Sequence, residues 1–239
     1  MSKFTYTGDE LEIFRHATNW KKYYRSKVVN HFLPGNVLEV GAGIGEMTKC
    51  LRPLCENQEW IALDPDKANT DAIEKLVLEG ELDKNVKTFN GFLNDLKKPK
   101  GSFSNLLFID SLEHIKDDSK TLKQASLLLS DGGILIIIAP AHNFLFNEFD
   151  HKIGHFRRYN KKTLRNILPE DIREVSNSYI DSAGFFLSLA NKFILRSSEP
   201  SLNQILFWDR IIVPISIFLD KFLNYQFGKN LVFIGYKIK

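Results

Sequence analysis

Cysteine and net charge are both scarce in this chain. Its 239 residues include only two cysteines, Cys50 and Cys55, too few for a disulfide framework, which favours a reducing compartment. The formal net charge at pH 7 is +3, too small to indicate nucleic-acid binding by itself. Residues 1–12 are polar and acidic and lack the apolar core of a secretory signal peptide. We therefore expect a cytoplasmic protein that does not bind nucleic acid.

Long apolar runs are also missing. Charged residues interrupt the most apolar stretch, residues 205–222, and its longest charge-free run is residues 211–219, whereas a membrane span needs about 20 residues. We expect this stretch not to span a membrane but to form a lid helix packed on the core. The alternative is an interfacial helix in peripheral contact with a membrane, because its aromatic residues lie beside Arg210 and Lys221.

Strand and helix patterns alternate up to residue 140. The apolar runs that predict strands are residues 36–41, 60–63, 86–89, 103–109 and 134–139. Helical patterns cover residues 9–32, 45–55, 67–79 and 118–129. Asp9 is the expected N-cap of the first helix, and Asp131-Gly132-Gly133 is the expected stop of the last. Unbroken apolar strands that alternate with helices indicate a parallel sheet covered on both faces.

The pattern changes after Pro140. Residues 141–159 are rich in histidine, aromatic and charged residues without a clear period, which is typical of a functional loop. A helix capped by Asn160 is expected to run to about residue 168. It is followed by a strand at 172–180, apolar helices across 183–224 and a final strand at 231–238. No linker or internal repeat interrupts the chain, so we expect a single domain over residues 1–239.

Residues 37–48, VLEVGAGIGEMT, are the most informative segment. Val37 to Val40 suit a buried strand, three glycines (Gly41, Gly43 and Gly45) then turn the chain, and a helical pattern begins at Glu46. A strand, a glycine turn and a helix N-terminus together present N–H groups and a positive dipole end to an anionic group. The segment therefore predicts a nucleotide-type cofactor.

The residues around the glycines narrow the choice of cofactor. A dinucleotide site has a third glycine where this chain has Glu46, and a P-loop has a Lys-Ser/Thr pair that is absent here. Glu39, near the end of the first strand, suits a ligand that carries an ammonium or sulfonium group. Asp64 ends the second strand, where a carboxylate can accept both ribose hydroxyls of an adenosine. The neighbouring Asp66 is the better candidate for a helix cap.

Together these motifs resemble those of the class I S-adenosylmethionine-dependent methyltransferases. Residues 37–45 look like the first motif of that family, Ala62-Leu63-Asp64 like the second, and residues 108–115, FIDSLEHI, like the fourth. The resemblance covers residues 35–140. It implies an α/β, Rossmann-like, seven-stranded and mostly parallel sheet with an antiparallel last strand and helices on both faces. A helical insertion is expected between strands 6 and 7.

The same resemblance implies a division of the domain and a cofactor. Residues 1–34 would form an N-terminal helical cap and 35–140 the cofactor-binding core, with acceptor-side or lid segments at 141–170 and 183–226. The implied cofactor is S-adenosylmethionine, its methionine carboxylate held by backbone N–H groups of the glycine loop. The residues expected to bind it are Glu39, Gly41, Ala42, Gly43, Gly45, Asp64, Pro65, Gly91, Phe92, Leu93, Asp110 and Ser111.

The adenine end departs from the commonest pattern of the family. Phe92 follows Gly91, where many relatives place an aspartate that binds the adenine amino group. The Phe92 ring or the N–H of Leu93 would hold the adenine instead, with Asn94 and Asp95 as candidates for a polar contact. Three aromatic residues of the N-terminal helix could close over the cofactor or simply pack there: Trp20, Tyr23 and Tyr24.

A narrower resemblance extends beyond Pro140. The segments 140–142 (PAH), 148–150 (EFD) and 154–159 (GHFRRY) are similar to a bacterial subgroup of methyltransferases often associated with sugar and surface-polysaccharide biosynthesis. We expect His142 to be the general base, because histidine suits that role and it follows the fifth strand closely. The other candidate catalytic residues are Asp110, His155, Arg158 and Tyr159. No metal ion is expected, because Gly154 weakens a helical ligand pair of His151 and His155.

These features predict a methyltransferase that acts on a hydroxyl or amine of a small molecule. Arg157 and Arg158 carry guanidinium forks that suit carboxylate or phosphate, so we expect an anionic acceptor such as a phosphorylated or nucleotide-linked sugar. The alternative is a non-catalytic S-adenosylmethionine-binding or scaffold subunit of a polysaccharide-biosynthesis assembly. No pattern in the chain indicates an oligomeric state.

Overall fold

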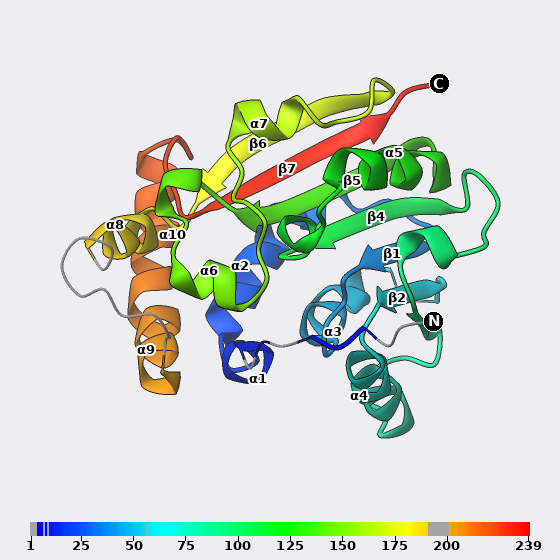
Figure 1. Ribbon diagram of the computed structural model, residues 1–239, viewed down its shortest axis with the longest axis horizontal. Coiled ribbons are helices and arrows are strands. Elements are labelled where there is room, and N and C mark those ends of the chain that lie inside the picture. Colours follow the sequence, from blue (N-terminus) through cyan, green and yellow to red (C-terminus); the bar gives the residue numbers. More distant parts are fainter. Residues whose placement is uncertain (1–3, 7, 9, 56, 191–200) are drawn as a thin grey trace.

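A seven-stranded sheet in the order β3-β2-β1-β4-β5-β7-β6 forms the centre of the computed structural model (Figure 1). The structure describes residues 4–6, 8, 10–55, 57–190 and 201–239. The strands are β1 (Val37–Val40), β2 (Trp60–Asp64), β3 (Val86–Asn90), β4 (Phe103–Ile109), β5 (Leu129–Pro140), β6 (Ile172–Ile180) and β7 (Asn230–Lys237). β7 pairs antiparallel with β5 and β6, and all other pairs are parallel. The predicted fold class is therefore confirmed.

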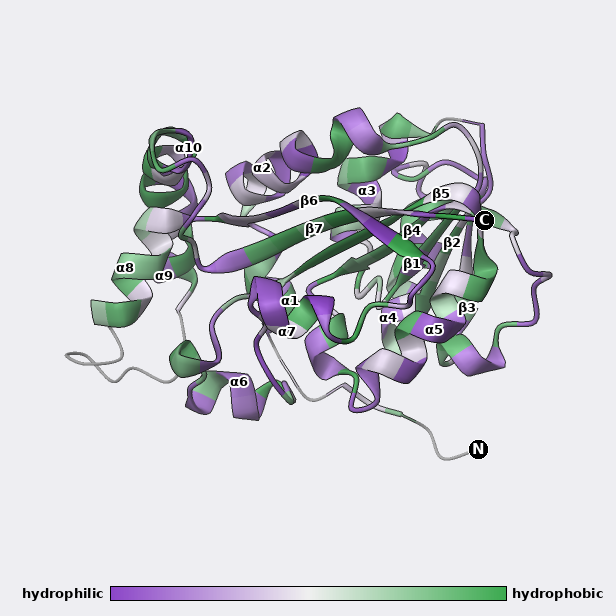
Figure 2. Ribbon diagram, turned by 90° about the horizontal axis from the view of Figure 1, so that it is seen from above, coloured by the Kyte–Doolittle hydropathy of each residue, from purple (hydrophilic) through white to green (hydrophobic). Residues whose placement is uncertain are grey.

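Helices cover both faces of this sheet, because its central strands are apolar on both sides. β1 and β2 are buried along their whole length. One face packs against α2 (Thr18–Val28), α3 (Glu46–Leu51) and α4 (Lys67–Leu78), and the other against α5 (Asp118–Leu128) and α7 (Lys161–Arg165). Figure 2 shows the strands of the sheet as mostly hydrophobic ribbons between these helices. Burial on both faces explains why the strands are continuous apolar runs.

The predicted helix over residues 9–32 is wrong as a single element. The structure has α1 (Glu10–Phe14), α2 and a short 3-10 turn, Val29–His31, and Asp9 lies outside the described residues. The break has a tertiary cause. The carboxylate of Asp209, far along the chain, accepts hydrogen bonds from the N–H groups of Asn19 at 3.2 Å and Trp20 at 2.8 Å. This supplies the cap that α2 lacks locally and starts a new helix there.

The predicted stop at residues 131–133 is also wrong, because β5 begins at Leu129 and runs through them. Leu129 pairs with Phe103 of β4, and the regular pairing resumes only between Ile134 and Asn105. The residues between them form an irregularity in the strand, with Gly132 in the left-handed region at φ +75°. Gly132 and Gly133, residues of a type that usually ends a helix, therefore lie within an irregular strand.

The helical insertion between β6 and β7 is present as predicted. It comprises α8 (Ser182–Ala190), α9 (Leu202–Phe207), a π-helical turn (Trp208–Ile212) and α10 (Val213–Phe222). These helices gather at the end of the molecule toward which β4 and β5 point (Figure 1). The insertion therefore stands beside the carboxyl ends of the parallel strands, where open α/β sheets bind ligands.

Residues Leu202–Phe222 form one helix that is long and apolar enough to cross a membrane by length and composition alone. The charge-free run within it, residues 211–219, is shorter than a membrane span. Two buried acids tie this helix to the core. Asp209 caps α2, and the carboxylate of Asp220 accepts from Tyr23 Oη at 2.7 Å and from the N–H groups of Asp181 and Ser182 at 2.7 and 2.8 Å. One face of the helix thus packs on the domain, as expected for a lid helix.

Candidate functional site

The glycine loop after β1 has the conformation that its sequence requires. Gly41 is in the left-handed region at φ +77°, and a Cβ there would lie 2.4 Å from Cβ of Ser111. Gly43 is at φ +55°, and its N–H donates to Asp64 Oδ2 at 2.9 Å. A larger residue would be strained at either position, and at the first it would also displace Ser111. The loop thus lies directly against the end of β2.

Asp66 has the capping role that was predicted for it, whereas the role of Asp64 as a ribose ligand stays a prediction. Asp64 is 5% exposed, and its carboxylate accepts from the N–H groups of Gly43 and Asp66 and from Asn69 Nδ2, at 2.9, 2.9 and 3.1 Å. Burial raises its pKa, although these three bonds oppose the shift. Asp66 caps α4, accepting from the N–H of Ala68 at 2.8 Å. Asp64 alone of the two therefore stands at the end of β2 beside the glycine loop.

Glu39 lies beneath the loop and is almost inaccessible, with 2% of its surface exposed. Its Oε2 accepts from Thr48 Oγ1 at 2.6 Å and from Trp60 Nε1 at 3.0 Å. Burial raises the pKa of Glu39 to about 7, although both hydrogen bonds oppose the shift. The carboxylate links β1, α3 and β2 under the loop, and its contact with a cofactor stays a prediction.

The predicted adenine contacts lie at the end of β3. The Phe92 side chain is 52% exposed, whereas Leu93 is buried. Asp95, a candidate for a polar contact, accepts the N–H of Phe92 at 3.0 Å and so shapes the turn. The N-terminal segment reaches this region, because Phe4 meets the Phe92 ring edge-on with centroids 5.8 Å apart. An exposed aromatic ring here is available for stacking on a flat ligand.

A polar group surrounds the end of β4. Asp110 has φ +48°, an uncommon conformation for a residue other than glycine, and its Oδ1 accepts from Tyr24 Oη at 3.2 Å. The same hydroxyl accepts from Asn230 Nδ2 at 2.7 Å. Asp110 is exposed, yet desolvation by the surrounding protein raises its pKa to about 7. Asp110 therefore combines exposure to solvent with close packing against Tyr24 at the end of β4.

Lys229 brings a positive charge to the same edge of the sheet. It directly precedes β7, and its Nζ lies 5.3 Å from the centroid of the Trp208 ring. No hydrogen bond or ion pair holds this ammonium within the part of the chain that the structure describes. Burial lowers its pKa, while the nearby carboxylates of Asp181 and Asp110 oppose that shift. Lys229 can therefore pair with an anion that binds at the carboxyl ends of the parallel strands.

Of the three aromatic residues expected near the cofactor, only Tyr24 reaches the polar group at the end of β4. The Trp20 ring packs on Trp208, with centroids 4.9 Å apart. The Tyr23 hydroxyl donates to Asp220 of α10 instead. Trp20 and Tyr23 thus anchor the helical insertion to α2.

His142 lies in an aromatic environment at the end of β5. Its ring stacks on Tyr179 with centroids 4.7 Å apart and contacts Phe144 and Phe185. Its φ is +64°, and among the described residues its buried Nε2 has no hydrogen-bond partner. Burial lowers its pKa, so the imidazole is neutral near pH 7. The unpartnered nitrogen is compatible with the predicted role of His142 as general base, which stays a prediction.

The other candidate catalytic residues form a separate buried network. Asp150 is fully buried and accepts from Arg158 Nε and Nη2 at 2.9 and 2.8 Å, and it is 2.7 Å from His155 Nδ1. Although burial opposes it, the bonds from His155 and Arg158 lower the pKa of Asp150 to about 2. Tyr159 Oη is 2.8 Å from Asp118 Oδ2. These contacts order the loop, and the catalytic roles of Arg158 and Tyr159 stay predictions.

The arginine pair that suggested an anionic acceptor is largely engaged within the protein. Arg157 pairs with Asp118 and donates to the carbonyl of Lys116 at 2.8 Å. Arg158 binds Asp150 through two of its nitrogens, although its buried Nη1 has no partner among the described residues. Sequence reasoning missed Lys229, whose ammonium has no hydrogen bond or ion pair within the described residues at the carboxyl ends of the strands. The sequence did contain a signal for Lys229. The residue directly precedes the last strand, and a reversed last strand begins at the edge of the sheet where the parallel strands end.

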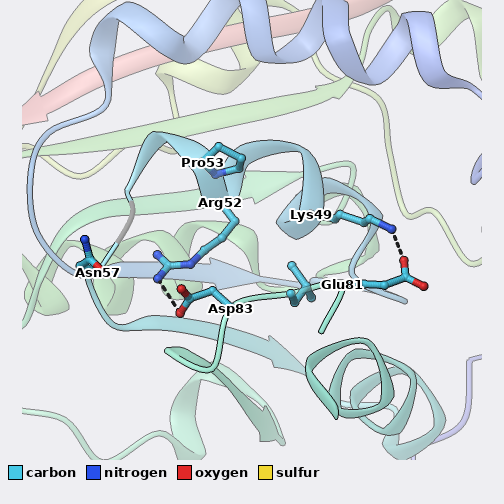
Figure 3. Close-up of a pocket in the computed structure, with 7 residues that line it drawn as sticks. Lys49, Arg52, Pro53, Asn57, Glu81 and Asp83 are labelled. Atoms are coloured by element: carbon cyan, nitrogen blue, oxygen red, sulfur yellow. Dashed lines mark hydrogen bonds and ion pairs between the residues drawn. The ribbon is translucent and has the colours of Figure 1, made fainter. Parts of the chain in front are cut away.

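A surface cavity of about 260 Å³ lies elsewhere (Figure 3). Its lining includes the ion pairs Lys49–Glu81 and Arg52–Asp83, the latter at 3.2 Å. These residues end α3 and precede β3, so the cavity is at the amino ends of the strands. Because ligands of open α/β sheets bind at the carboxyl ends, we do not assign the cofactor to it.

Comparison with known proteins agrees with this arrangement. The profile of a methyltransferase-domain family matches residues 15–171. No curated protein matches the chain. Similar solved structures include the YcgJ protein of Bacillus subtilis, at 17% identity over 92% of this chain and 99% of that chain, with a TM-score of 0.60.

Two further similar structures are enzymes with a named methyl acceptor. Geranyl diphosphate C-methyltransferase from Streptomyces coelicolor, with S-adenosyl-L-homocysteine bound, has a TM-score of 0.64 at 13% identity, over 91% of this chain and 77% of that chain. Phosphoethanolamine N-methyltransferase 2 from Haemonchus contortus, with S-adenosyl-L-methionine bound, has a TM-score of 0.63 at 16% identity. The match covers 100% of this chain and 58% of that chain. At such identities the likeness shows the fold alone. The matched profile covers well over half of the chain, which therefore belongs to this family of methyltransferase domains.

Proposed function

We propose that the protein transfers a methyl group from S-adenosylmethionine to a hydroxyl or amine of a small anionic molecule, such as a sugar derivative. The observation that carries this proposal is the contact between the glycine loop and Asp64, with Gly43 N and Asp64 Oδ2 2.9 Å apart. The contact places the glycine turn and a carboxylate side by side at the carboxyl ends of β1 and β2. The carboxylate suits a ribose diol, whereas the N–H groups of Gly41, Ala42, Gly43 and Gly45 are bonded within the protein, contrary to the role with a methionine carboxylate that was expected of the loop.

The acceptor side follows from the polar group at the end of β4. The acceptor oxygen or nitrogen attacks the methyl carbon, the C–S bond breaks, and S-adenosylhomocysteine leaves with the electron pair. Asp110, whose pKa is raised to about 7, takes the acceptor proton. Lys229 pairs with the anionic group of the acceptor, and His142 donates to or accepts from it. Positioning supplies much of the acceleration in such an in-line displacement.

This proposal predicts stoichiometric binding of the cofactor and turnover. Calorimetric titration should give one S-adenosylmethionine or S-adenosylhomocysteine per chain and a raised melting temperature, with no response to NAD. With phosphorylated and nucleotide-linked sugars, S-adenosylhomocysteine should form, and Asp110→Asn should slow its formation by roughly 100-fold or more while the cofactor still binds. Binding without turnover on any acceptor, cell extract included, would support the non-catalytic alternative. Absence of binding would overturn both.

We also propose that the helix Leu202–Phe222 lies on an anionic membrane surface, where a lipid-linked acceptor would be found. Large apolar side chains are exposed on its outer face: Phe207 53%, Ile211 49%, Ile215 45%, Phe218 72% and Phe222 81%. Their spacing of three or four residues places them in one stripe, and the exposed cations Arg210 and Lys221 are on the same helix. An apolar stripe with adjacent cations fits the headgroup region of a bilayer.

Flotation with vesicles tests this surface. The protein should float with vesicles that contain phosphatidylglycerol and much less with pure phosphatidylcholine, and Phe218→Ser with Phe222→Ser should abolish flotation. Leu78→Ser is the matched control, because Leu78 is 87% exposed at the end of α4. The alternative outcome is that the wild type does not float and is a dimer, and that the double variant is a monomer. That result would show that the stripe binds a second copy of the chain instead of a membrane.

A further inference from the structure

Three side chains of the kinds that bind metal ions converge beyond the end of β4. Glu113 and His114 belong to the turn Leu112–His114 after β4, and His155 follows the short helix α6 (Glu148–Lys152). One potential ligand atom from each lies within 4.8 Å of the others, and His155 Nε2 is 3.7 Å from Glu113 Oε1. Metal–ligand bonds of roughly 2.0–2.2 Å place neighbouring ligand atoms about 3–4 Å apart, so small side-chain rotations would complete a site.

Glu113 is the second, independent sign of a ligand. Its side chain is fully buried, at 0% exposure, and neither carboxylate oxygen has a hydrogen-bond partner among the described residues. A buried carboxylate without a partner costs several kcal/mol in the ionised form, by order of magnitude. A bound cation would remove this penalty.

The surroundings of His155 hold it in the state that a metal ligand needs. Its Nδ1 is 2.7 Å from Asp150 Oδ1, and Arg158 keeps Asp150 ionised through its Nε and Nη2. Because an ionised carboxylate only accepts, Nδ1 carries a proton, and Nε2 is the ring nitrogen that lies toward Glu113, 3.7 Å from its Oε1. A carboxylate behind a ligating histidine is the usual arrangement around bound metals.

The backbone fixes the two segments against each other. The N–H of Phe156 donates to the carbonyl of Glu113 at 2.8 Å, and the N–H of His155 donates to that of Asp150 at the same distance. The rings of His114 and His155 meet edge-on with centroids 4.5 Å apart. These backbone and ring contacts hold the two histidines and Glu113 side by side.

We propose that Glu113, His114 and His155 bind one divalent transition-metal ion of the Zn²⁺ or Mn²⁺ type. Two imidazoles and one carboxylate favour such ions over Mg²⁺ or Ca²⁺, which prefer oxygen ligands. Three protein ligands leave a coordination position open. Resting on the proposed function, that position would hold an oxygen of the acceptor close to Asp110, three residues before Glu113. The sequence suggested no metal because the ligands come from distant segments rather than from one helix.

Metal binding can be measured without cofactor or acceptor, so its failure is distinct from failure of the proposed function. We expect the chelator-treated full chain to take up about one Zn²⁺ or Mn²⁺ per chain by elemental analysis after gel filtration. Its melting temperature should rise with either ion and not with Mg²⁺. Cobalt(II) substitution should give visible absorption bands typical of nitrogen coordination. Glu113→Gln and His155→Asn should each reduce the bound metal to background.

Two further variants sharpen this test. His151→Asn is the matched control, because His151 is exposed on α6 and contacts Phe146; it should retain the metal. Asp150→Asn should weaken the affinity by about 10–100-fold, as for other partners of metal ligands. Two ligand variants are used so that a folding defect in one does not decide the outcome. No metal uptake by the wild type, or full uptake by both ligand variants, would overturn the proposal and leave a neutral, protonated Glu113 in a metal-free network.

Discussion

Replacement of Asp64 by alanine is expected to weaken S-adenosylmethionine binding by roughly 10–100-fold, because a hydrogen bond to a charged group contributes about 1.5–3 kcal/mol. The change would remove the proposed acceptor for the ribose hydroxyls. It would also free the N–H of Gly43 and the amide of Asn69, both of which the carboxylate now holds. Calorimetric titration measures the dissociation constant, and the unfolding transition without ligand shows whether the variant is folded.

Asp66→Ala is the matched control for this prediction. Asp66 lies two residues further along, is as buried as Asp64 at 6% exposed, and caps α4. Loss of such a cap should lower the free energy of unfolding by about 1 kcal/mol. Its effect on the dissociation constant should be much smaller than that of Asp64→Ala. Equal effects of the two substitutions on affinity would mean that Asp64 only shapes the loop.

Glu39→Gln is expected to remove a large pH dependence of stability. The pKa of Glu39 is raised to about 7 in the folded chain from 4.5 in the unfolded chain. The contribution of Glu39 to the free energy of unfolding is therefore greatest below pH 4.5. It is lost as the pH rises through 7, because the unfolded chain releases its proton at a lower pH than the folded chain does. The shift corresponds to about 3 kcal/mol. From pH 4 to pH 8, the variant should therefore gain about 3 kcal/mol in stability relative to wild type.

Urea unfolding of the wild type and of Glu39→Gln at several pH values measures this difference. The contributions of the other titrating groups are the same in both proteins and cancel in the difference. Glu59→Gln is a control of opposite sign, because hydrogen bonds from Lys87 lower the pKa of this half-buried carboxylate. Its contribution should be small and should be lost toward low pH. If the difference between Glu39→Gln and wild type stays constant with pH, the pKa of Glu39 is the same in the folded and unfolded chains and burial does not raise it.

Most of the sheet could be predicted because its strands carry their own signal. The bounds of β4 and β6 agree with the predicted residues 103–109 and 172–180. The errors are at places where distant residues decide. The first predicted helix is divided by a cap from Asp209, and β5 absorbs Gly132 because Leu129 already pairs with Phe103. Local propensity contains neither of these contacts.

The cofactor side of the site was more predictable than the acceptor side for the same reason. The glycine loop and Asp64 are recognisable because a strand, its turn and the next helix are consecutive in the chain. Lys229 lies at the carboxyl ends of the parallel strands only because β7 is reversed, and Arg158 is engaged by Asp150 rather than free. The arginine pair on which the predicted anionic acceptor was based is therefore bound within the protein, and the charge of the acceptor stays a prediction.

The sequence by itself determined the order of strands and helices, the glycine turn and the carboxylate that follows β2, because each depends on residues close together along the chain. Only the tertiary structure decided which charged groups neutralise one another and which remain free. Asp150 takes the guanidinium of Arg158, and Glu113 is left buried beside His155 without a hydrogen bond among the described residues. Charges interact through space, so their pairing depends on the distances that folding sets.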